Sequence, residues 1–323
     1  MKTVLLTGAA GFIGSKTTEF LLADKTKVIG LDNMNDYYDV KIKQHRLQHL
    51  QKDKNFIFHK NDIENHAAIK KIFQQHKIDA VINLAARAGV RYSMINPYVY
   101  FSTNTQGTLN LLELCREFKI KKFVLASTSS LYAGQKMPFK ENLAVNTPIS
   151  SYAASKKAAE VTCYTYHYLY DIDITVLRYF TVYGPAGRPD MCMFRFIKWI
   201  DEGQPIELFG DGSQSRDFTY VDDIAKGTIK AMRKVGFETI NLGGGNKPYK
   251  LTYVIKLIEK YLGKKVRIKQ FDFHKTDLKA TWADISKAKN ILKWEPTIEL
   301  EDGVKRCVQW YQDNKSWVKN VKL

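Results

Sequence analysis

The start of the chain holds the pattern that most restricts its fold. A short apolar run at residues 3–7 leads into Gly8-Ala9-Ala10-Gly11-Phe12-Ile13-Gly14, and a helical pattern then continues to about Ala23. A second apolar run, at residues 27–31, ends in Asp32. A strand, a glycine-rich turn, a helix and a second strand that ends in an acid are together typical of a dinucleotide-binding unit. The sequence therefore predicts an α/β fold that begins with such a unit.

The glycines and the acid each have a physical role in this prediction. The spacing is G-x-x-G-x-x-G, and these glycines allow a tight turn, close approach of backbone N–H groups to a pyrophosphate, and close packing of helix on strand. A carboxylate at Asp32 can bind the hydroxyls of an adenosine ribose and would repel a 2′-phosphate. The residues that follow, Asn33-Met34-Asn35, include no arginine. We therefore expect NAD rather than NADP, with a glycine-rich turn that binds no ligand as the alternative.

The rest of the first half alternates between two patterns. Strand-like runs lie at residues 55–59, 79–84, 122–127 and 173–178, and helix-like stretches lie at 65–76, 103–118 and 151–169. This alternation predicts a Rossmann-type doubly wound parallel sheet with helices on both faces. From Pro185 onward the pattern changes to mixed helices and short strands. We expect an NAD-binding domain over residues 1–180 and a smaller, mixed α/β part over 181–323 that mainly binds substrate, with some segments returning to the first domain.

Three short segments follow predicted strands. They are Asp62-Ile63, Ala85-Ala86-Arg87 and Ser127-Thr128-Ser129. Because ligands bind at the carboxyl ends of the strands in such sheets, these segments should line one crevice. Asp62 either contacts the adenine end of the cofactor or caps the helix that starts near Asn65.

Tyr152 and Lys156, in the stretch 151–156, form the candidate catalytic pair. The stretch is Ala-rich and follows the cap-like residues Ser150 and Ser151, so it predicts the first turns of a helix with both side chains on one face. Lowering a tyrosine pKa from ~10 to about 7 needs roughly 4 kcal/mol, which one lysine and a cationic cofactor ring can supply in a dry site. Tyr152 is therefore a candidate general base for a hydroxyl group that is oxidised to a ketone. Taken alone, the pattern fits an ordinary half-buried pair better, and its weight comes from the cofactor motif at the start of the chain.

The composition argues against several other classes of protein. The 323 residues carry a formal net charge of +17, but no nucleic-acid recognition motif accompanies the lysines, and a basic field also attracts anionic nucleotides. Four cysteines without ligand spacing favour a reducing compartment and no metal site. His45 and His49, beside Lys43 and Arg46, are expected on a solvated helix face. Because neither a membrane-spanning stretch nor a signal-peptide pattern is present, we expect a cytoplasmic protein.

Further stretches carry a resemblance to a known family. They are residues 31–39 (Leu-Asp-Asn-Met-Asn-Asp-Tyr-Tyr-Asp), 88–93 (Ala-Gly-Val-Arg-Tyr-Ser), 136–139 (Lys-Met-Pro-Phe), 180–185 (Phe-Thr-Val-Tyr-Gly-Pro) and 187–191 (Gly-Arg-Pro-Asp-Met). With the glycine motif and the Tyr152–Lys156 pair, nearly the whole chain resembles the extended short-chain dehydrogenase/reductase superfamily. Within it, the chain is similar to the NAD-dependent nucleotide-sugar epimerases, and most of all to the UDP-glucuronate 4-epimerases.

The resemblance implies a site and a mechanism. In the implied catalytic triad, Tyr152 removes the proton of the sugar 4-hydroxyl, Thr128 hydrogen-bonds the same oxygen, and Lys156 lowers the tyrosine pKa and binds the nicotinamide ribose. The implied cofactor contacts are Gly8, Gly11, Phe12, Ile13, Gly14, Asp32, Asn33, Asp62, Ile63, Leu84, Ala85, Ala86, Asn104, Tyr152 and Lys156. The implied substrate contacts are Ser129, Ser130, Thr181, Arg188, Arg216 and Asp277. A homodimer through the helices at 103–118 and 151–169 is implied as well.

The residues after Thr128 and around Arg188 bear on the substrate. Related dehydratases carry Thr-Asp-Glu where this chain has Thr128-Ser129-Ser130, and related decarboxylases typically carry a glutamate there. Two neutral hydroxyls can hydrogen-bond a sugar carboxylate but do not readily drive elimination. Arg188 either offers a bidentate fork to such a carboxylate or pairs with Asp190 at the rim. Thr181 stands where galactose-type epimerases usually have asparagine.

Three positions depart from the family pattern. Lys275-Thr276 replaces the Pro-Gly that usually precedes the aspartate at Asp277, Arg87 replaces a residue that is commonly glutamine, and Ala133 interrupts the usual Tyr-Gly. The first of these changes the loop on which the implied role of Asp277 depends.

Together, these features predict an NAD-dependent nucleotide-sugar 4-epimerase. The best fit is interconversion of UDP-glucuronate and UDP-galacturonate through a transient 4-keto intermediate, feeding polysaccharide synthesis, with a UDP-sugar as partner and neither nucleic acid nor membrane. The open alternatives are a 4-epimerase of UDP-glucose or another nucleotide-hexose, a UDP-glucuronate decarboxylase, and a non-catalytic NAD-binding regulator on the same fold. The intact triad argues against the regulator.

Overall fold

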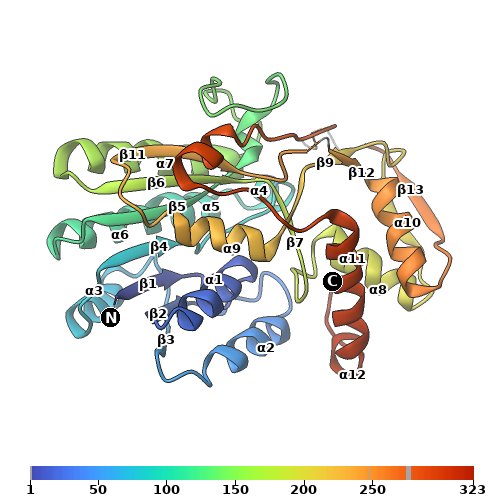
Figure 1. Cartoon of the computed structure of the whole chain (residues 1–323), viewed down its shortest axis with the longest axis horizontal. Coiled ribbons are helices and arrows are strands. Elements are labelled where there is room, and N and C mark those ends of the chain that lie inside the picture. The colour runs from blue at the N-terminus through green and yellow to red at the C-terminus, as the bar shows by residue number, and fades with distance from the viewer. Residues whose placement is uncertain (1, 247, 274–277) are drawn as a thin grey trace.

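A seven-stranded parallel sheet forms the centre of the computed structural model, which describes residues 2–246, 248–273 and 278–323 (Figure 1). Its strand order is β11-β6-β5-β4-β1-β2-β3. The strands are β1 (Thr3–Thr7), β2 (Lys27–Asp32), β3 (Phe56–Lys60), β4 (Ala80–Asn83), β5 (Lys122–Thr128), β6 (Asp173–Tyr179) and β11 (Phe237–Leu242). The first six lie within about one residue of the runs expected from the sequence, and the doubly wound sheet is confirmed.

Side chains that alternate along β1 show which helices cover each face of the sheet. Val4 and Leu6 pack in a core with α1, α2 and α9, whereas Leu5, between them, packs in a core with α3, α6 and α7. Successive side chains of a strand point to opposite faces, so this apolar run is buried on both sides. The helices are α1 (Phe12–Ala23), α2 (Val40–Leu50), α3 (His66–Gln75), α6 (Gly107–Glu117), α7 (Ser151–Tyr170) and α9 (Val221–Lys230). Among the described residues, no helix is both long and apolar enough to cross a membrane.

The strand order reverses between β1 and β4. The chain passes from β1 outward to β2 and β3 and then returns to place β4 on the other side of β1. Ligands of doubly wound sheets bind at such a point, at the carboxyl ends of the strands. Here the Thr7 hydroxyl donates to Asn83 Oδ1 (2.7 Å) and accepts from Ala85 N (3.1 Å). These bonds fix the glycine turn after β1 next to the segment after β4.

One expected helix is irregular at its start. The sequence predicts a helix over 103–118, but Phe101–Gln106 form a π-helix (η1), and α6 begins only at Gly107. The Asn104 side chain accepts from Arg87 N (2.9 Å) and donates to Arg87 O (3.0 Å) and to Ser155 Oγ (2.9 Å). These bonds tie the π-helix both to the segment after β4 and to α7. Single π-helical turns are frequent at functional sites.

A smaller group of elements lies beside the carboxyl edge of the sheet, on the right in Figure 1. It contains α8 (Cys192–Asp201), α10 (Leu251–Leu262), α11 (Leu300–Asp313), α12 (Lys315–Val318), the parallel pairs β7 (Thr181–Tyr183) with β10 (Phe218–Tyr220) and β8 (Ile206–Phe209) with β13 (Ile268–Phe271), and the antiparallel pair β9 (Ser215–Arg216) with β12 (Tyr249–Lys250). Most of these elements share a core of their own. Two later elements belong to the large sheet instead: β11 is one of its strands, and α9 packs against it. The division at residue 180, with these segments returning to the first domain, stays our proposal.

Candidate active site

A cavity of about 740 Å³ opens at the carboxyl ends of the strands, and most of the residues singled out from the sequence lie in its wall. They are Gly8, Gly11, Phe12, Ile13, Gly14, Asp32, Asn33, Asp62, Ile63, Leu84, Ala85, Ala86, Thr128, Ser129, Ser130, Tyr152, Lys156, Thr181, Arg188 and Arg216. Asn104, within the described part of the chain, is not in the wall and instead makes the bonds to Arg87 and Ser155 given above. Asp277 lies outside the described residues. One cavity therefore joins the glycine motif, the Tyr152–Lys156 pair and Arg188.

The glycine turn has the shape that a dinucleotide pyrophosphate requires. Gly8 has φ +71°, and a Cβ there would lie 2.8 Å from Ala85 N. A Cβ on Gly14 would lie 2.0 Å from Gly8 O, so the turn closes only with glycine at these positions. Helix α1 follows with Gly11 as N-cap, without a side-chain capping bond and without an acid in its first turn. The N–H groups at this helix start fit an anionic group bound in the cavity.

Two carboxylates lie next to this turn. Asp32 is buried, and its oxygens accept from Ala10 N (3.1 Å) and Met34 N (2.8 Å), which leaves each oxygen a second lone pair for a ribose hydroxyl. Asp62 accepts from Asn33 Nδ2 at 2.7 Å and lines the cavity. The N-cap of α3 is Asn65, so the capping role considered for Asp62 is wrong.

Replacing Asp32 with alanine should weaken NAD binding and reduce the preference for NAD over NADP. The variant loses the proposed ribose contact together with the charge that would repel a 2′-phosphate. We expect about 1.5 to 3 kcal/mol less binding energy for NAD, the usual range for hydrogen bonds to a charged group. Titration of both cofactors into the purified variant measures this, and an unchanged NAD affinity would make Asp32 only a support for the Ala10 and Met34 backbone.

At the start of α7, Lys156 is buried and Tyr152 is half-buried. Ser150 caps this helix by accepting from Ala153 N at 3.2 Å, which places Tyr152 in the first turn. Burial raises the pKa of Tyr152, while a hydrogen bond with Thr128 and the charge of Arg188 lower it. The sequence analysis expected Lys156 to favour the phenolate, but Thr128 and Arg188 do so instead. The Lys156 ammonium donates to Ala126 O at 2.8 Å.

The Lys156→Met substitution should stabilise the protein although it removes a proposed catalytic group. Burial lowers the pKa of Lys156 from 10.5 to about 8, a shift that amounts to roughly 3 kcal/mol against the charged form. Allowing for the lost bond to Ala126 O, we expect a gain of about 1 to 3 kcal/mol in the free energy of unfolding near pH 7.

The pH dependence separates this effect from general repacking. Since the lysine pKa is lower in the folded than in the unfolded chain, the folded state binds fewer protons, and the stability of the unaltered protein rises as the pH increases from about 8 toward 10.5. The variant lacks this rise, so its advantage in urea unfolding should shrink over that range. A variant that is less stable near neutral pH, or a difference independent of pH, would contradict the prediction.

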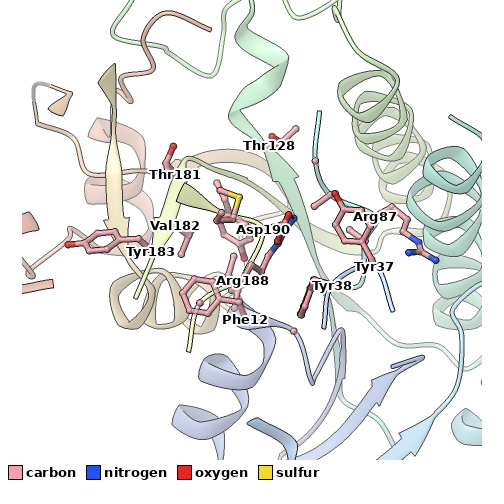
Figure 2. A pocket seen from close by; sticks show the side chains of 18 of the residues that line it. Phe12, Tyr37, Tyr38, Arg87, Thr128, Thr181, Val182, Tyr183, Arg188 and Asp190 are labelled. Carbon is pink, nitrogen blue, oxygen red and sulfur yellow. The ribbon is translucent and has the colours of Figure 1, made fainter. Parts of the chain in front are cut away.

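Neutral hydroxyl groups line the wall next to Thr128, at the end of β5. Thr128 Oγ1 accepts from Ser130 N (3.1 Å) and lies 3.1 Å from Ser130 Oγ, in the 3₁₀ turn η2 (Ser129–Tyr132). Thr181, on β7, faces the same cavity (Figure 2). The wall therefore offers hydrogen bonds to a polar or anionic sugar substituent without a carboxylate in this stretch that could drive elimination.

Arg188 combines the two alternatives considered for it. It lines the cavity, and its Nε and Nη2 also donate to Asp190 Oδ1 (3.0 Å) and Oδ2 (2.5 Å). Figure 2 shows Arg188 and Asp190 between Phe12 on one side and Tyr37 and Tyr38 on the other. Burial opposes the charge on Arg188, but Asp190 and the tyrosines outweigh it, and its pKa is raised above the ordinary value. A permanent cation therefore lies in the cavity with its Nη1 group free of the Asp190 fork.

The solvated face expected on α2 holds His49, which is exposed, and His45, which is half-buried, but not the two basic residues beside them. Lys43 and Arg46 are 4% and 5% exposed, and both are directed toward the cavity side of the fold. The signal was present in the sequence, because these two cations fall on the same helical stripe as Ile42, Leu47 and Leu50. The apolar stripe, rather than the neighbouring histidines, shows which face is buried.

Tyr100 is a further residue of the site that the sequence did not reveal. It is fully buried, its ring meets the Tyr152 ring edge-on with 6.0 Å between centroids, and its hydroxyl donates to Gly89 O at 2.9 Å. It lies in α5 (Tyr98–Tyr100), after α4 (Tyr92–Ile95), in a stretch without clear periodicity. Only the folded chain brings it against Tyr152.

Comparisons with known proteins agree with this geometry. Residues 4–243 match the model of the NAD dependent epimerase/dehydratase family. A UDP-glucuronate 4-epimerase of Thermodesulfobacterium geofontis is 57% identical, over 99% of both chains. The crystal structure of UDP-glucuronic acid 4-epimerase from Bacillus cereus in complex with UDP-glucuronic acid and NAD has a TM-score of 0.91 at 38% identity, covering 97% of this chain and 99% of that one. A UDP-glucose 4-epimerase from Thermotoga maritima, solved with UDP-glucose, has a TM-score of 0.88 at 31% identity, with coverage of 97% and 99%.

Proposed function

Because this chain belongs to the NAD-dependent epimerase/dehydratase family, we propose that it interconverts UDP-glucuronate and UDP-galacturonate through a 4-keto sugar. The observation that carries the proposal is the placement of Arg188 and the hydroxyls of Thr128, Ser129, Ser130 and Thr181 in one cavity with Tyr152. Such a wall suits a sugar that carries a carboxylate. The names of the similar proteins from T. geofontis and B. cereus support the same substrate.

The proposed chemistry divides between the cofactor and the protein. NAD, held at the glycine turn and Asp32, supplies a hydride acceptor that returns the hydride within each cycle and so is not consumed. Tyr152 accepts the proton of the sugar 4-hydroxyl and returns it to the same oxygen after the sugar has turned its other face toward the nicotinamide. Thr128, which already hydrogen-bonds Tyr152, steadies the charge that develops on the same oxygen. Lys156 lies one turn along α7, where we propose that it holds the nicotinamide ribose.

The sugar has to turn between the two proton transfers, while its nucleotide stays in place. Arg216, in β9, lies in the cavity wall, and we propose that it binds the diphosphate. We keep Asp277 as a proposed ribose contact from the sequence alone. Anchoring at the diphosphate would leave the sugar ring free to present either face to the nicotinamide while its 4-oxygen stays near Tyr152.

A neutral UDP-hexose is the second candidate substrate, and one observation favours it. Asp190 already occupies the fork of Arg188, so the cation does not need a substrate carboxylate for its charge balance. The similar UDP-glucose 4-epimerase of T. maritima agrees with this alternative. The two candidates make opposite predictions about which sugar is turned over faster.

Incubation of the purified protein with separate UDP-sugars, followed by NMR of the products, tests the proposal. UDP-glucuronate should give UDP-galacturonate without added NAD if the cofactor co-purifies, and UDP-glucose should react much more slowly. A faster reaction with UDP-glucose would favour the second candidate. A UDP-pentose as the main product would identify a decarboxylase, and no reaction with any sugar would support the non-catalytic regulator.

We further propose that the protein forms a homodimer through the helices at 103–118 and 151–169, and that it acts in the cytoplasm. Helix α7 exposes several apolar side chains, including Val161 (52%), Tyr164 (54%) and Leu169 (57%). Apolar patches of this kind often mark an interface between protein chains. The location is supported by the four cysteines, all of which are free thiols.

The double substitution Val161→Glu and Leu169→Glu should produce a monomer. Related by a two-fold axis, the new carboxylates would face an apolar partner surface, and we expect the dimer dissociation constant to rise by at least about 100-fold. Light scattering during gel filtration measures the mass. Ile268→Glu, a change at an equally exposed apolar residue on β13 (52%), is the matched control and should leave the mass unchanged. An unchanged mass in the double variant would exclude this interface.

A further inference from the structure

Arg46, on α2, joins two loops at the cavity that are far apart in the sequence. Its Nε and Nη2 donate to Ala186 O at 3.0 and 2.6 Å, and its Nη1 donates to Ala10 O at 3.1 Å. Ala10 belongs to the glycine turn, and Ala186 lies two residues before Arg188. One buried side chain therefore touches both the cofactor loop and the loop that carries the substrate-facing arginine.

The loop around Ala186 needs such support. Ala186 has φ +52°, a left-handed conformation that is unfavourable for a residue other than glycine and that persists where the surroundings impose it. Arg46 binds the carbonyl of this residue with two N–H groups, which fixes the peptide plane that leads to Arg188. The conformation of the loop and the position of Arg188 therefore both depend on Arg46.

Tyr38 adds a second connection between the two arginines. Its hydroxyl accepts from Arg46 Nη1 at 3.0 Å, and its ring lies 6.0 Å from the Arg188 guanidinium. The Arg46 guanidinium also lies 5.8 Å from the Tyr38 ring and 5.7 Å from the Phe12 ring, at the start of α1. The contacts of Arg46 thus run from the glycine turn and α1, through Tyr38 and Ala186, to Arg188.

We propose that Arg46 is a positioning residue that couples the glycine turn to Arg188 and thereby sets the preference for a sugar carboxylate over a neutral sugar. This inference rests on the proposed function, in which Arg188 faces the sugar carboxylate. Arg46 would act without touching the substrate. Binding of the dinucleotide at the glycine turn would stiffen the loop that carries Arg188, so cofactor and acidic sugar would bind cooperatively.

Substitution of Arg46 tests the inference by its effect on the ratio of two affinities. Arg46→Met keeps an apolar stem of similar packing but removes every donated bond, and Arg46→Lys can reach only one carbonyl at a time. Binding is measured in a Tyr152→Phe background, in which turnover is blocked, with saturating NAD. Arg46→Met should lower the preference for UDP-glucuronate over UDP-glucose about tenfold, and Arg46→Lys should have an intermediate effect.

A double-mutant cycle and hydrogen exchange distinguish positioning from a general loss of structure. If Arg46 acts through Arg188, Arg46→Met should not change the sugar preference further once Arg188→Ala is present. Without the Met substitution, NAD should slow amide exchange in segment 184–191, which includes the Met191 N–H bound to Arg188 O. In the Arg46→Met variant, NAD should leave amide exchange in segment 184–191 unchanged.

The outcomes separate this inference from the proposed function. If the protein with Arg46 intact binds UDP-glucuronate no better than UDP-glucose, the proposed function fails, and the exchange experiment alone decides whether the two loops are coupled. The inference is overturned, and the function stands, if Arg46→Met keeps the full preference for UDP-glucuronate. The same holds if the effects of Arg46→Met and Arg188→Ala on that preference are additive. Should Arg46→Met fail to fold, Arg46→Lys carries the same comparisons.

Discussion

Replacing Tyr152 with phenylalanine should lower turnover by about 10²- to 10⁴-fold, the usual contribution of a positioned general base, while NAD stays bound. The change removes a single oxygen from a half-buried side chain and keeps the ring that packs edge-on against Tyr100. The lost hydroxyl is the one that hydrogen-bonds Thr128, so the group that takes the sugar proton disappears and the cavity otherwise keeps its shape. Steady-state kinetics with UDP-glucuronate, together with the NAD content of the purified variant, measure both effects.

Tyr168→Phe provides the matched control for this prediction. Tyr168 lies on the same helix, α7, but is 75% exposed, so loss of its hydroxyl should change neither turnover nor NAD content. Turnover close to that of the unaltered protein in Tyr152→Phe would remove Tyr152 from the mechanism. A variant that loses its NAD would show that the hydroxyl serves cofactor binding instead.

The electrostatics around Tyr152 show where the phenolate gains its stability. Burial raises the pKa of Tyr152 and lowers that of Lys156, so the protein interior disfavours the charged form of each group. Arg188 and Thr128 act in the opposite direction on Tyr152. Arg188 therefore has two effects in the proposed mechanism, because it can bind a carboxylate and also favours the phenolate.

Local patterns predicted the scaffold well, for a physical reason. The glycine turn, the strand runs and the capped start of α7 each depend on contacts between neighbours in sequence or on burial of a continuous apolar run, and all of these are visible in the sequence. Asp32 and the Tyr152–Lys156 pair could be located because they hold fixed offsets from such elements. Their placement in the same cavity follows from the parallel sheet that the alternation of patterns predicted, because the carboxyl ends of its strands lie at one edge.

The residues that the sequence analysis missed are those whose partners lie far along the chain. Arg46 binds Ala10 and Ala186, and Tyr100 packs on Tyr152. None of these pairings leaves a periodic signal, since each depends on how a loop returns to the sheet. Arg46 was also assigned to solvent by residue type, although its position on the apolar stripe of α2 indicated burial. Position on the helix was the stronger signal.

Replacing Arg188 with alanine should decrease kcat/KM for UDP-glucuronate by the equivalent of about 2 to 4 kcal/mol, because a carboxylate loses a charged partner in a partly dry site. UDP-glucose should be affected far less. Arg188 also favours the Tyr152 phenolate, so a smaller loss common to both sugars is expected, and the comparison of the two sugars removes it. Kinetics of the variant with both substrates give the difference.

The matched control, Asp190→Asn, separates the effect of the Arg188 cation on sugar preference from the effect of its ion pair with Asp190. Arg188→Ala leaves Asp190 without the partner it holds at 2.5 and 3.0 Å, which could by itself disturb the loop. Asp190→Asn breaks the same ion pair but keeps the cation in the cavity. It should therefore retain the preference for UDP-glucuronate that Arg188→Ala loses. If both variants lose the preference equally, the ion pair rather than the cation determines it.

The product pattern provides a second test of Arg188. The proposed intermediate is a β-keto acid, which loses CO₂ most easily when its C–CO₂ bond lies parallel to the carbonyl π system. Arg188, with the hydroxyls of Ser129, Ser130 and Thr181, would hold the carboxylate so that this bond stays out of alignment while the sugar turns. Arg188→Ala should then release some UDP-4-keto-pentose, which leaves before it regains the hydride, and so leave a matching fraction of the cofactor reduced; NMR and near-ultraviolet absorbance detect the two. Equal losses on both sugars, without pentose and without reduced cofactor, would leave Arg188 as no more than the ion-pair partner of Asp190.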